Sequence, residues 1–407
     1  MNLSRRSLLA SFGAGGLTVL RWPARVRANP APETSAEPVT LPAIDAARIA
    51  RRVVESLQPS PGERAILVYD PLYYPEIAGA IQAGLRAAGA RPVIALTFDP
   101  PAIVRGEAGG SIPAEGIEER TVAFLRPLFE QAAMFLWLPA RELSGDTRWE
   151  HLLAASRARG IHFHWILPLE GHRAEEVATL SRMYERAILE TDYPALSREQ
   201  DRLIAALRGQ SIRITDARGT DLRLRVPPDA WFHKNDGDMS PARAAAARCV
   251  RDREMEFPSG ALRFIPDVGS TEGRLVVTTP VPRTAASPPE ADVITLEFER
   301  GRAVRHHAAK DDGAFARMWN EFGGDIDKVG EIVIGTNPLL AGTLPSGALP
   351  YYGYGEGHVR VSMGDNWESG GANRSPSGRP LWLFLDKPTV ESGGRALVVV
   401  KDGRVVK

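Results

Sequence analysis

Cysteine is almost absent from this chain, in which Cys249 is the single cysteine among 407 residues. A single cysteine allows no internal disulfide, so stability has to come from packing, with or without a metal or a partner chain. An excess of either charge is also absent, because 50 lysines and arginines balance 50 aspartates and glutamates. This balance gives no indication of nucleic-acid binding. After residue 28 no apolar run is long enough to span a membrane.

Common nucleotide and hydrolase motifs are missing as well. The sequence contains neither G-x-x-x-x-G-K-[ST], which cradles phosphates, nor G-x-S-x-G, which presents a nucleophilic serine. The glycine cluster at residues 353–357 does not follow an apolar strand into a helix, so it does not indicate a dinucleotide site.

The first 28 residues have the pattern of a twin-arginine signal peptide. Arg5 and Arg6 precede an apolar run from Leu8 to Leu20, and Val26-Arg27-Ala28 ends the segment with a small-x-small cleavage pattern. We therefore expect cleavage after Ala28 and a mature protein that is periplasmic or extracellular. Loss of this segment removes five arginines and leaves 45 basic residues against 50 acidic ones. Residues 29–42 are expected to be a flexible spacer.

Residues 43–209 alternate helical patterns with short apolar runs, which indicates strands covered on both faces. The expected strands are Ala65–Tyr69, Pro92–Leu96, Met134–Leu138 and Ile161–Leu167. This half is predicted to be an α/β domain with a parallel sheet. Its last helix is expected at Ser197–Leu207, opened by the capping box Ser197-x-x-Gln200 and ended by Gly209.

Residues 210–407 have a β-rich pattern. Ser211–Thr215 and Leu222–Val226 alternate apolar and polar residues on either side of Gly219, which predicts a hairpin. Four more strands and one helix are expected at Ala261–Ile265, Arg274–Thr278, Val293–Phe298, Arg395–Val399 and Gly313–Phe322. We expect a second, mixed α+β domain, with the boundary near residue 209.

Two pairs of histidines are candidate metal ligands. His162 and His164 lie two apart on an expected strand, so both imidazoles point to one face, as a metal site requires. The interpretation that we favour is that they pack at the strand end and bond to the backbone. His306 and His307 are adjacent and face opposite ways, so at most one of them can join a site.

The densest polar pattern lies between residues 329 and 373. Glu331, His358 and Asp365 are residue types that bind divalent metals, and neighbouring glycines allow close approach of the backbone. The local pattern leaves a metal site and an ordinary glycine-rich loop equally open.

Short motifs run in order along most of residues 45–400. The strongest are Gly330-Glu-Ile-Val-Ile-Gly-Thr-Asn-Pro338, His358-Val-Arg-Val-Ser-Met-Gly-Asp-Asn366 and Gly370-Gly371. Weaker ones are Pro61-Gly-Glu-Arg64, Ala87-Ala-Gly-Ala90 and Gly219-Thr-Asp-Leu222. In these motifs the chain resembles the thermophilic metallo-aminopeptidases, which include aminopeptidase T and whose fold a group of dihydroxypyridine dioxygenases shares.

The resemblance implies that fold and, for the aminopeptidases, two divalent metals held by glutamate, histidine and aspartate. Glu331 and His358 match two of these ligands, and Asp365 is a further candidate. The other ligand positions align with Ala261, Tyr351, Pro380 and Trp382, and no histidine follows His358. Two ligands cannot hold a binuclear centre, although other carboxylates such as Glu256 leave a single altered site open.

Three functions are therefore considered. The first is an exported metallo-aminopeptidase, in which zinc, cobalt or manganese polarises the peptide carbonyl and activates water. The second, which the ligand count favours, is a non-peptidase on the same fold that binds a peptide or small molecule or acts as a scaffold. The third is a mononuclear iron enzyme like the dioxygenases, which needs a second histidine.

The second function predicts a cleft lined by polar and aromatic side chains in place of metal ligands. The candidates are Asn337, Tyr351, Tyr354, Asn366, Trp367 and Trp382. The alternative is that the aromatic rings only fill the volume that a metal centre would occupy. The resemblance also implies a homodimer.

Overall fold

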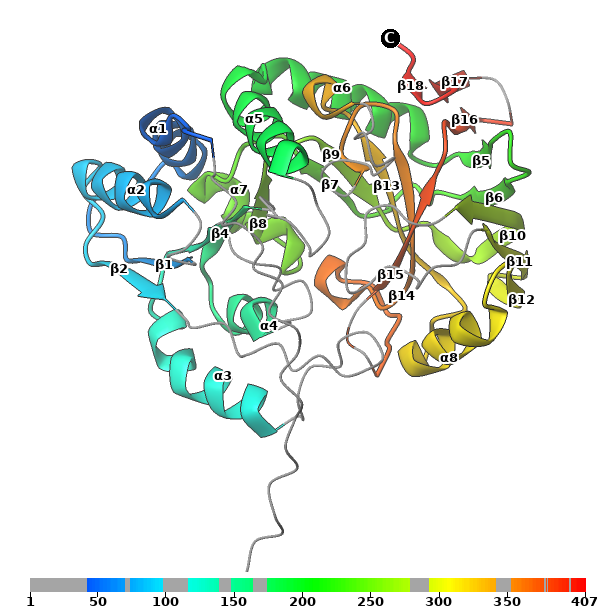
Figure 1. The fold of residues 1–407 in the computed structure, drawn as a ribbon, viewed down its shortest axis with the longest axis horizontal. Coiled ribbons are helices and arrows are strands. Elements are labelled where there is room, and N and C mark those ends of the chain that lie inside the picture. Colours follow the sequence, from blue (N-terminus) through cyan, green and yellow to red (C-terminus); the bar gives the residue numbers. More distant parts are fainter. Residues whose placement is uncertain are drawn as a thin grey trace, which may run out of the picture. The chain divides into compact units, whose positions relative to one another are not determined.

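The computed structural model describes residues 42–69, 74–97, 116–138, 148–163, 174–278, 293–341, 353–376, 378, 380–394 and 397–407 (Figure 1). The expected signal peptide and nearly all of the spacer lie outside these residues. The segment from Thr40 to Lys407 forms one compact unit. None of the described helices is both long and apolar enough to cross a membrane.

The first sheet is parallel and has the strand order β2-β1-β3-β4-β8. Its strands are β1 (Ala65–Tyr69), β2 (Val93–Thr97), β3 (Met134–Trp137), β4 (Arg159–Phe163) and β8 (Glu254–Phe257). The parallel sheet predicted from the apolar runs is confirmed. β4 begins two residues before the expected Ile161, because Arg159 and Gly160 already pair with β3.

Helices cover both faces of this sheet, as the apolar runs predicted. The helices are α1 (Ala46–Leu57), α2 (Pro75–Ala87), α3 (Gly116–Phe129), α4 (Arg148–Ala155) and α5 (Ala174–Glu190). Leu67 and Leu136 on one face share a core with residues of α1, α2 and α5. Ile66 and Phe135 on the other face share a core with residues of α3 and α4.

Helix α6 (Tyr193–Leu207) begins earlier than the sequence predicted, and the capping box expected at Ser197 is wrong. The cap is Asp192, whose carboxylate accepts a hydrogen bond from the Ala195 amide at 2.9 Å. Ser197 lies inside the helix and donates to Asp236 at 2.8 Å. The competing signal was an aspartate followed by a proline in the first turn, which is an equally good helix start. Gly209 follows the helix with a φ of 75°, as expected.

The second sheet has eight strands in the order β12-β11-β10-β6-β5-β16-β17-β18. They are β5 (Ser211–Thr215), β6 (Asp221–Arg225), β10 (Asp267–Thr278), β11 (Val293–Glu299), β12 (Arg302–Ala308), β16 (Thr389–Ser392), β17 (Leu397–Lys401) and β18 (Arg404–Val405). The hairpin predicted around Gly219 is confirmed, with Ile214 opposite Leu222.

The third sheet is antiparallel and has the order β15-β14-β13-β9-β7. Its strands are β7 (Phe232–Asn235), β9 (Ala261–Phe264), β13 (Val329–Gly335), β14 (Val359–Gly364) and β15 (Pro380–Leu385). The remaining short elements are α7 (Pro241–Ala245), η1 (Arg251–Arg253), α8 (Asp312–Phe322), η2 (Pro338–Leu340) and η4 (Trp367–Ser369).

The two faces of the third sheet differ in chemistry. On one face Leu262, Ile332 and Val361 join a core with the second sheet. The cross-strand register places polar side chains on the opposite face, which is also buried. They include His233, Asn235, Arg263, Glu331, Arg360 and Ser362. A buried polar face requires partners for each of its groups.

The link from β8 to β9 carries the chain from the first sheet to the third. It turns at Gly260, which has a φ of 150°, and a Cβ there would lie 2.3 Å from the Cβ of Asn337. Only glycine fits this close approach. β8 lies after the domain boundary expected near residue 209, yet it pairs with β4 of the first sheet. The boundary itself stays a prediction.

Strand β13 provides a direct test of the shared core. Ile334 is fully buried between the second and third sheets, so Ile334→Ala should lower the free energy of unfolding by about 2–5 kcal/mol. The matched control is Val304→Ala on β12, where the side chain is 49% exposed and the loss should be below about 0.5 kcal/mol. Urea denaturation measures both, and equal losses would contradict this packing.

Candidate functional site

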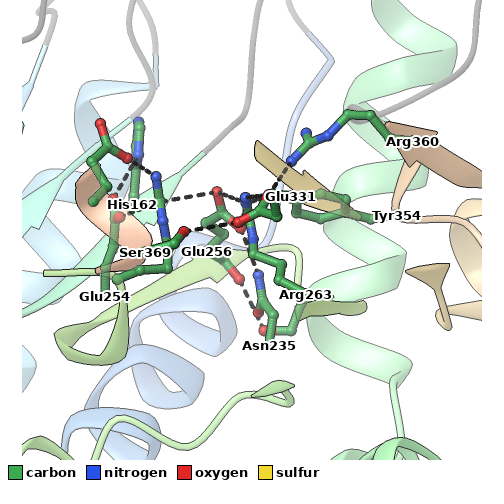
Figure 2. A network of polar contacts seen from close by, with 12 residues as sticks. His162, Asn235, Glu254, Glu256, Arg263, Glu331, Tyr354, Arg360 and Ser369 are labelled. Carbon is green, nitrogen blue, oxygen red and sulfur yellow. Dashed lines mark hydrogen bonds and ion pairs between the residues drawn. The ribbon is translucent and has the colours of Figure 1, made fainter. Parts of the chain in front are cut away.

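A network of buried charges joins the parallel first sheet to the polar face of the third (Figure 2). Its carboxylates come from Glu254 and Glu256 on β8 and from Glu331 on β13. Its guanidinium groups include Arg263 on β9 and Arg360 on β14. β8 belongs to the first sheet and continues into β9 of the third sheet. The two sheets therefore meet close to this network.

Arg263 lies at the centre of the network. Its Nη2 atom donates to both carboxylate oxygens of Glu256, at 2.7 and 2.6 Å, and its Nη1 atom donates to Glu331 at 3.1 Å. The Tyr354 hydroxyl contacts Arg263 and donates to Glu256. Asn235 donates to Glu256 at 2.9 Å. One arginine thus bridges two carboxylates that belong to two different sheets.

Glu331 uses both of its carboxylate oxygens within the protein. Oε1 accepts from Arg263 and, at 3.2 Å, from Arg360, while Oε2 accepts from Ser369 at 2.8 Å. Burial alone raises the pKa of Glu331, but the charges of Arg263 and Arg360 outweigh it, and the pKa lies below its ordinary value. Glu331 is therefore an ionised carboxylate that is already paired.

The other end of the network is more exposed and is centred on Arg251 of η1. Arg251 pairs with Glu254 and with Glu368 of η4. Glu254 also accepts from His162 Nδ1 at 2.9 Å, and the imidazole stacks on Trp137 with centroids 4.2 Å apart. Burial raises the pKa of Glu254, but Arg251 and His162 bring it down to about 2.

Carboxylates outnumber guanidinium groups among the described members of the network. The four carboxylates are Glu254, Glu256, Glu331 and Glu368, and the three guanidinium groups are Arg251, Arg263 and Arg360. Glu368 shares its single arginine with Glu254 and has a side chain that is 20% exposed. Burial raises the pKa of Glu368, Arg251 opposes this, and Glu254 adds to it, so the pKa lies above its ordinary value. Of these four carboxylates, Glu368 is therefore the one that binds a proton more readily than a free glutamate.

His358 lies on the same face of the third sheet as Glu331 but at the other end of the strand pair. Its carbonyl accepts from the Gly335 amide at 2.8 Å, whereas Glu331 lies opposite Ser362. Arg360 follows His358 by two residues on β14 and directs its guanidinium to Glu331 on β13 (Figure 2). Of the two expected metal ligands, Glu331 is thus paired with a cation from the strand that follows His358.

Asp365 and Asn366 hold the turn that follows β14. The Asp365 carboxylate accepts from the amides of Trp367 at 3.0 Å and Ser375 at 2.9 Å. Asn366 donates to the Gly330 carbonyl at 2.8 Å and accepts from the Asn373 amide at 3.0 Å. Their hydrogen bonds organise the backbone around Glu331.

The remaining expected cleft residues are placed as follows. Asn337 is fully buried and donates to Thr191 at 3.0 Å and to the Ser259 carbonyl at 2.6 Å. Tyr354 is buried in the network, and Trp382 lies under the Arg360 guanidinium, 4.6 Å from the ring centre. Trp367 packs beside the core formed with α3 and α4. Tyr351 lies outside the described residues.

The comparisons with known proteins establish the fold. No protein-family model and no curated protein match the chain. The 2,5-dihydroxypyridine dioxygenase from Pseudomonas putida KT2440 is 18% identical, with a TM-score of 0.60 over 89% of this chain and 98% of that one. Wild-type AmpT from Thermus thermophilus is 15% identical, with a TM-score of 0.60 over 89% of this chain and 99% of that one.

This chain has the fold of these two proteins. The metallo-aminopeptidase-like fold that the sequence motifs implied is confirmed, and with it the mixed α/β class. At 18% and 15% identity the likeness concerns the fold, and the chemistry has to be argued from the residues of the site.

The site does not fit the pair of divalent metals that the resemblance to aminopeptidases implies. Arg263, Arg360 and Ser369 take both oxygens of Glu331, and the two guanidinium charges repel a further cation. Ala261, on the same face, has only a methyl group. Within the described ranges, no three His, Cys, Asp or Glu side chains are grouped so that they could hold a metal ion.

The histidine pairs do not form a second site in the described part of the chain. His162 bonds to the Glu254 carboxylate, a contact that the favoured interpretation did not include, and His164 lies outside the described residues, so that interpretation stays a prediction. His306 stacks on Trp319 with centroids 4.7 Å apart, while His307 contacts Asp312 at 3.3 Å. The two adjacent histidines thus make separate contacts, in agreement with the expectation that they do not act together.

The sequence reasoning missed the arginines of the network. Arg263 and Arg360 each lie within a short apolar run, Ala261-Leu-Arg-Phe264 and Val359-Arg-Val361. An arginine inside a buried strand needs a carboxylate partner, because an unpaired buried charge is very costly. That signal, together with Glu254 and Glu256 alternating on β8, could have indicated buried ion pairs, although not which carboxylate meets which arginine.

Glu368→Gln tests the surplus charge. A carboxyl whose pKa rises from 4.5 on folding stabilises the protein at low pH, and this contribution is lost as the pH rises through the folded pKa. The wild type and the variant should therefore be about equally stable near pH 4, and the wild type should become the less stable of the two towards pH 9. Urea denaturation across this range measures the difference.

The matched control is Glu321→Gln on α8, where the side chain is exposed and outside the network. It should leave the pH dependence of unfolding unchanged. A stability difference between wild type and Glu368→Gln that does not change with pH would contradict the assignment of the surplus charge.

Proposed function

We propose that this chain is an exported protein that uses the AmpT fold without metal-dependent peptide hydrolysis and acts by binding rather than by catalysis. The observation that carries the proposal is the pairing of Glu331 with Arg263 and Arg360. A metallopeptidase needs its carboxylates free to coordinate metal and to leave a position open for water. Here the carboxylate that best matches a family ligand is bound by two permanent cations.

Export is supported by the sequence of residues 1–28. Paired arginines, an apolar run and a small-x-small exit occur there in the order of a twin-arginine signal. The single cysteine is compatible with an oxidising compartment, because it allows no internal disulfide that could mispair.

The metal content of the purified mature protein tests the loss of hydrolysis. After growth with manganese, cobalt and zinc, we expect less than about a tenth of an equivalent of any metal, because the charges of Glu331 are already neutralised. We also expect no hydrolysis of aminoacyl reporters that a chelator abolishes. AmpT from Thermus thermophilus, purified in the same way, is the comparison protein.

Variants of the two residues that match family ligands complete this test. Glu331→Ala and His358→Ala should show the same low metal content as the wild type. Stoichiometric metal in the wild type that is lost in both variants, together with chelator-sensitive hydrolysis, would overturn the proposal and restore the metallo-aminopeptidase.

Export is tested by a paired substitution in the signal. Arg5→Lys with Arg6→Lys should keep the chain in the cytoplasm at its full mass, because the route recognises the two arginines. The control, Arg21→Lys with Arg25→Lys, replaces two arginines that are not part of the recognised pair, so it should still give processed, exported protein. Fractionation with intact-mass measurement distinguishes them, and export of the first variant would contradict the assignment.

A further inference from the structure

Arg263 occupies a position where a cation is required. Glu256 and Glu331 direct carboxylates at it from β8 and β13, and both residues are almost fully buried, with 2% and 5% exposure. Two buried carboxylates side by side repel each other unless a positive charge lies between them. Arg263, itself 4% exposed, supplies that charge.

The other two arginines do not bridge carboxylates in the same way. Arg360 contacts Glu331 and lies over the Trp382 ring, and Arg251 lies 3.5 Å from Glu256 while pairing with Glu254 and Glu368. Burial lowers the pKa of Arg263, but Glu256 and other anionic neighbours outweigh it, and the pKa lies above its ordinary value. For Arg360, burial and the nearby Arg263 keep the pKa below its ordinary value.

The hydrogen bonds of the Arg263 guanidinium go to oxygen atoms, and the buried His233 on β7 lies opposite Arg263. The carboxylates of Glu256 and Glu331 and the hydroxyl of Tyr354 contact it directly. Asn235 is fully buried, and its Oδ1 atom has no hydrogen-bond partner among the described residues, while Nδ2 bonds to Glu256. A half-turn of this amide would present Oδ1 to the same place. Oxygen ligands of this kind suit manganese, calcium or magnesium better than zinc.

We propose that the Arg263 guanidinium is a built-in cation that closes a latent metal site formed by Glu256, Glu331, Tyr354 and Asn235. The inference rests on the proposed function, because it assumes that the wild-type site takes no metal. An arginine and a divalent cation would do the same thing here: each would neutralise and join two carboxylates that come from two sheets. Removing the guanidinium leaves the two buried carboxylates without a shared cation, so that a hard divalent cation can bind in its place.

Thermal unfolding of Arg263→Met with and without manganese tests this inference. Methionine has a similar length and no charge, so the variant should melt about 10 °C lower than the wild type, because two buried carboxylates lose their shared partner. Added manganese should raise the melting temperature of the variant with concentration and leave that of the wild type unchanged. A variant that is soluble only when the cells are grown with manganese would support the inference in the same way as a rise in melting temperature.

Two controls separate this effect from general destabilisation. Arg263→Met with Glu331→Gln removes one carboxylate, so its melting temperature should not respond to manganese. Arg159→Met removes another buried arginine, which pairs with Glu63 at 2.7 Å, and should be destabilised without a manganese response.

The outcomes distinguish the two proposals. A wild-type melting temperature that rises with manganese would overturn the proposed function, because the site would then be open. An Arg263→Met variant that shows no manganese response in melting temperature or soluble yield would overturn the latent site and leave the proposed function standing.

Discussion

The bridge from Arg263 to Glu256 and Glu331 is the interaction on which the joint between the first and third sheets depends. Apolar packing alone would hold the sheets together without fixing their relative position, because burial of apolar surface has no direction. A guanidinium with fixed donors fits two carboxylates in one arrangement only. The link at Gly260 brings β8 and β9 close enough for this bridge, and the bridge then determines how the polar face of the third sheet is used.

That use is the basis for proposing that this chain shares the fold of AmpT without its metal-dependent chemistry. The face that presents Glu331 and His358 also presents Arg263 and Arg360, and the two arginines take the carboxylate. Tyr354 and Trp382, which were considered as cleft residues, pack against the same guanidinium groups. These two aromatic rings therefore belong to the surroundings of the charge network, and whether they also line a binding cleft stays a prediction.

Much of the fold could be predicted from the sequence because its signals are local. The apolar runs from Ala65 to Tyr69 and from Met134 to Trp137 predict buried strands, and the alternation around Gly219 predicts the hairpin. The start of α6 was misread because Asp192 and Ser197 are both good caps, and only tertiary contacts decide between them. The network could not be assembled in this way, since its members lie on strands that are distant in sequence. Which of the carboxylates meets which arginine depends on register and on sheet order, and no local pattern gives either.

A buried ion-pair network is not the most stabilising way to fill a core, because desolvation offsets much of the attraction between charges. Its contribution here is better understood as specificity for one arrangement of the sheets. An arrangement that leaves a buried carboxylate without a cation is energetically unfavourable. A network made of side chains is complete as soon as the chain has folded, whereas a metal centre also depends on the supply of metal. For a protein that is proposed to cross the membrane after folding, this removes one requirement from the cytoplasmic step. The arginine bridge therefore accounts for how the sheets are joined and, under the proposed function, for how the fold is kept without a metal centre.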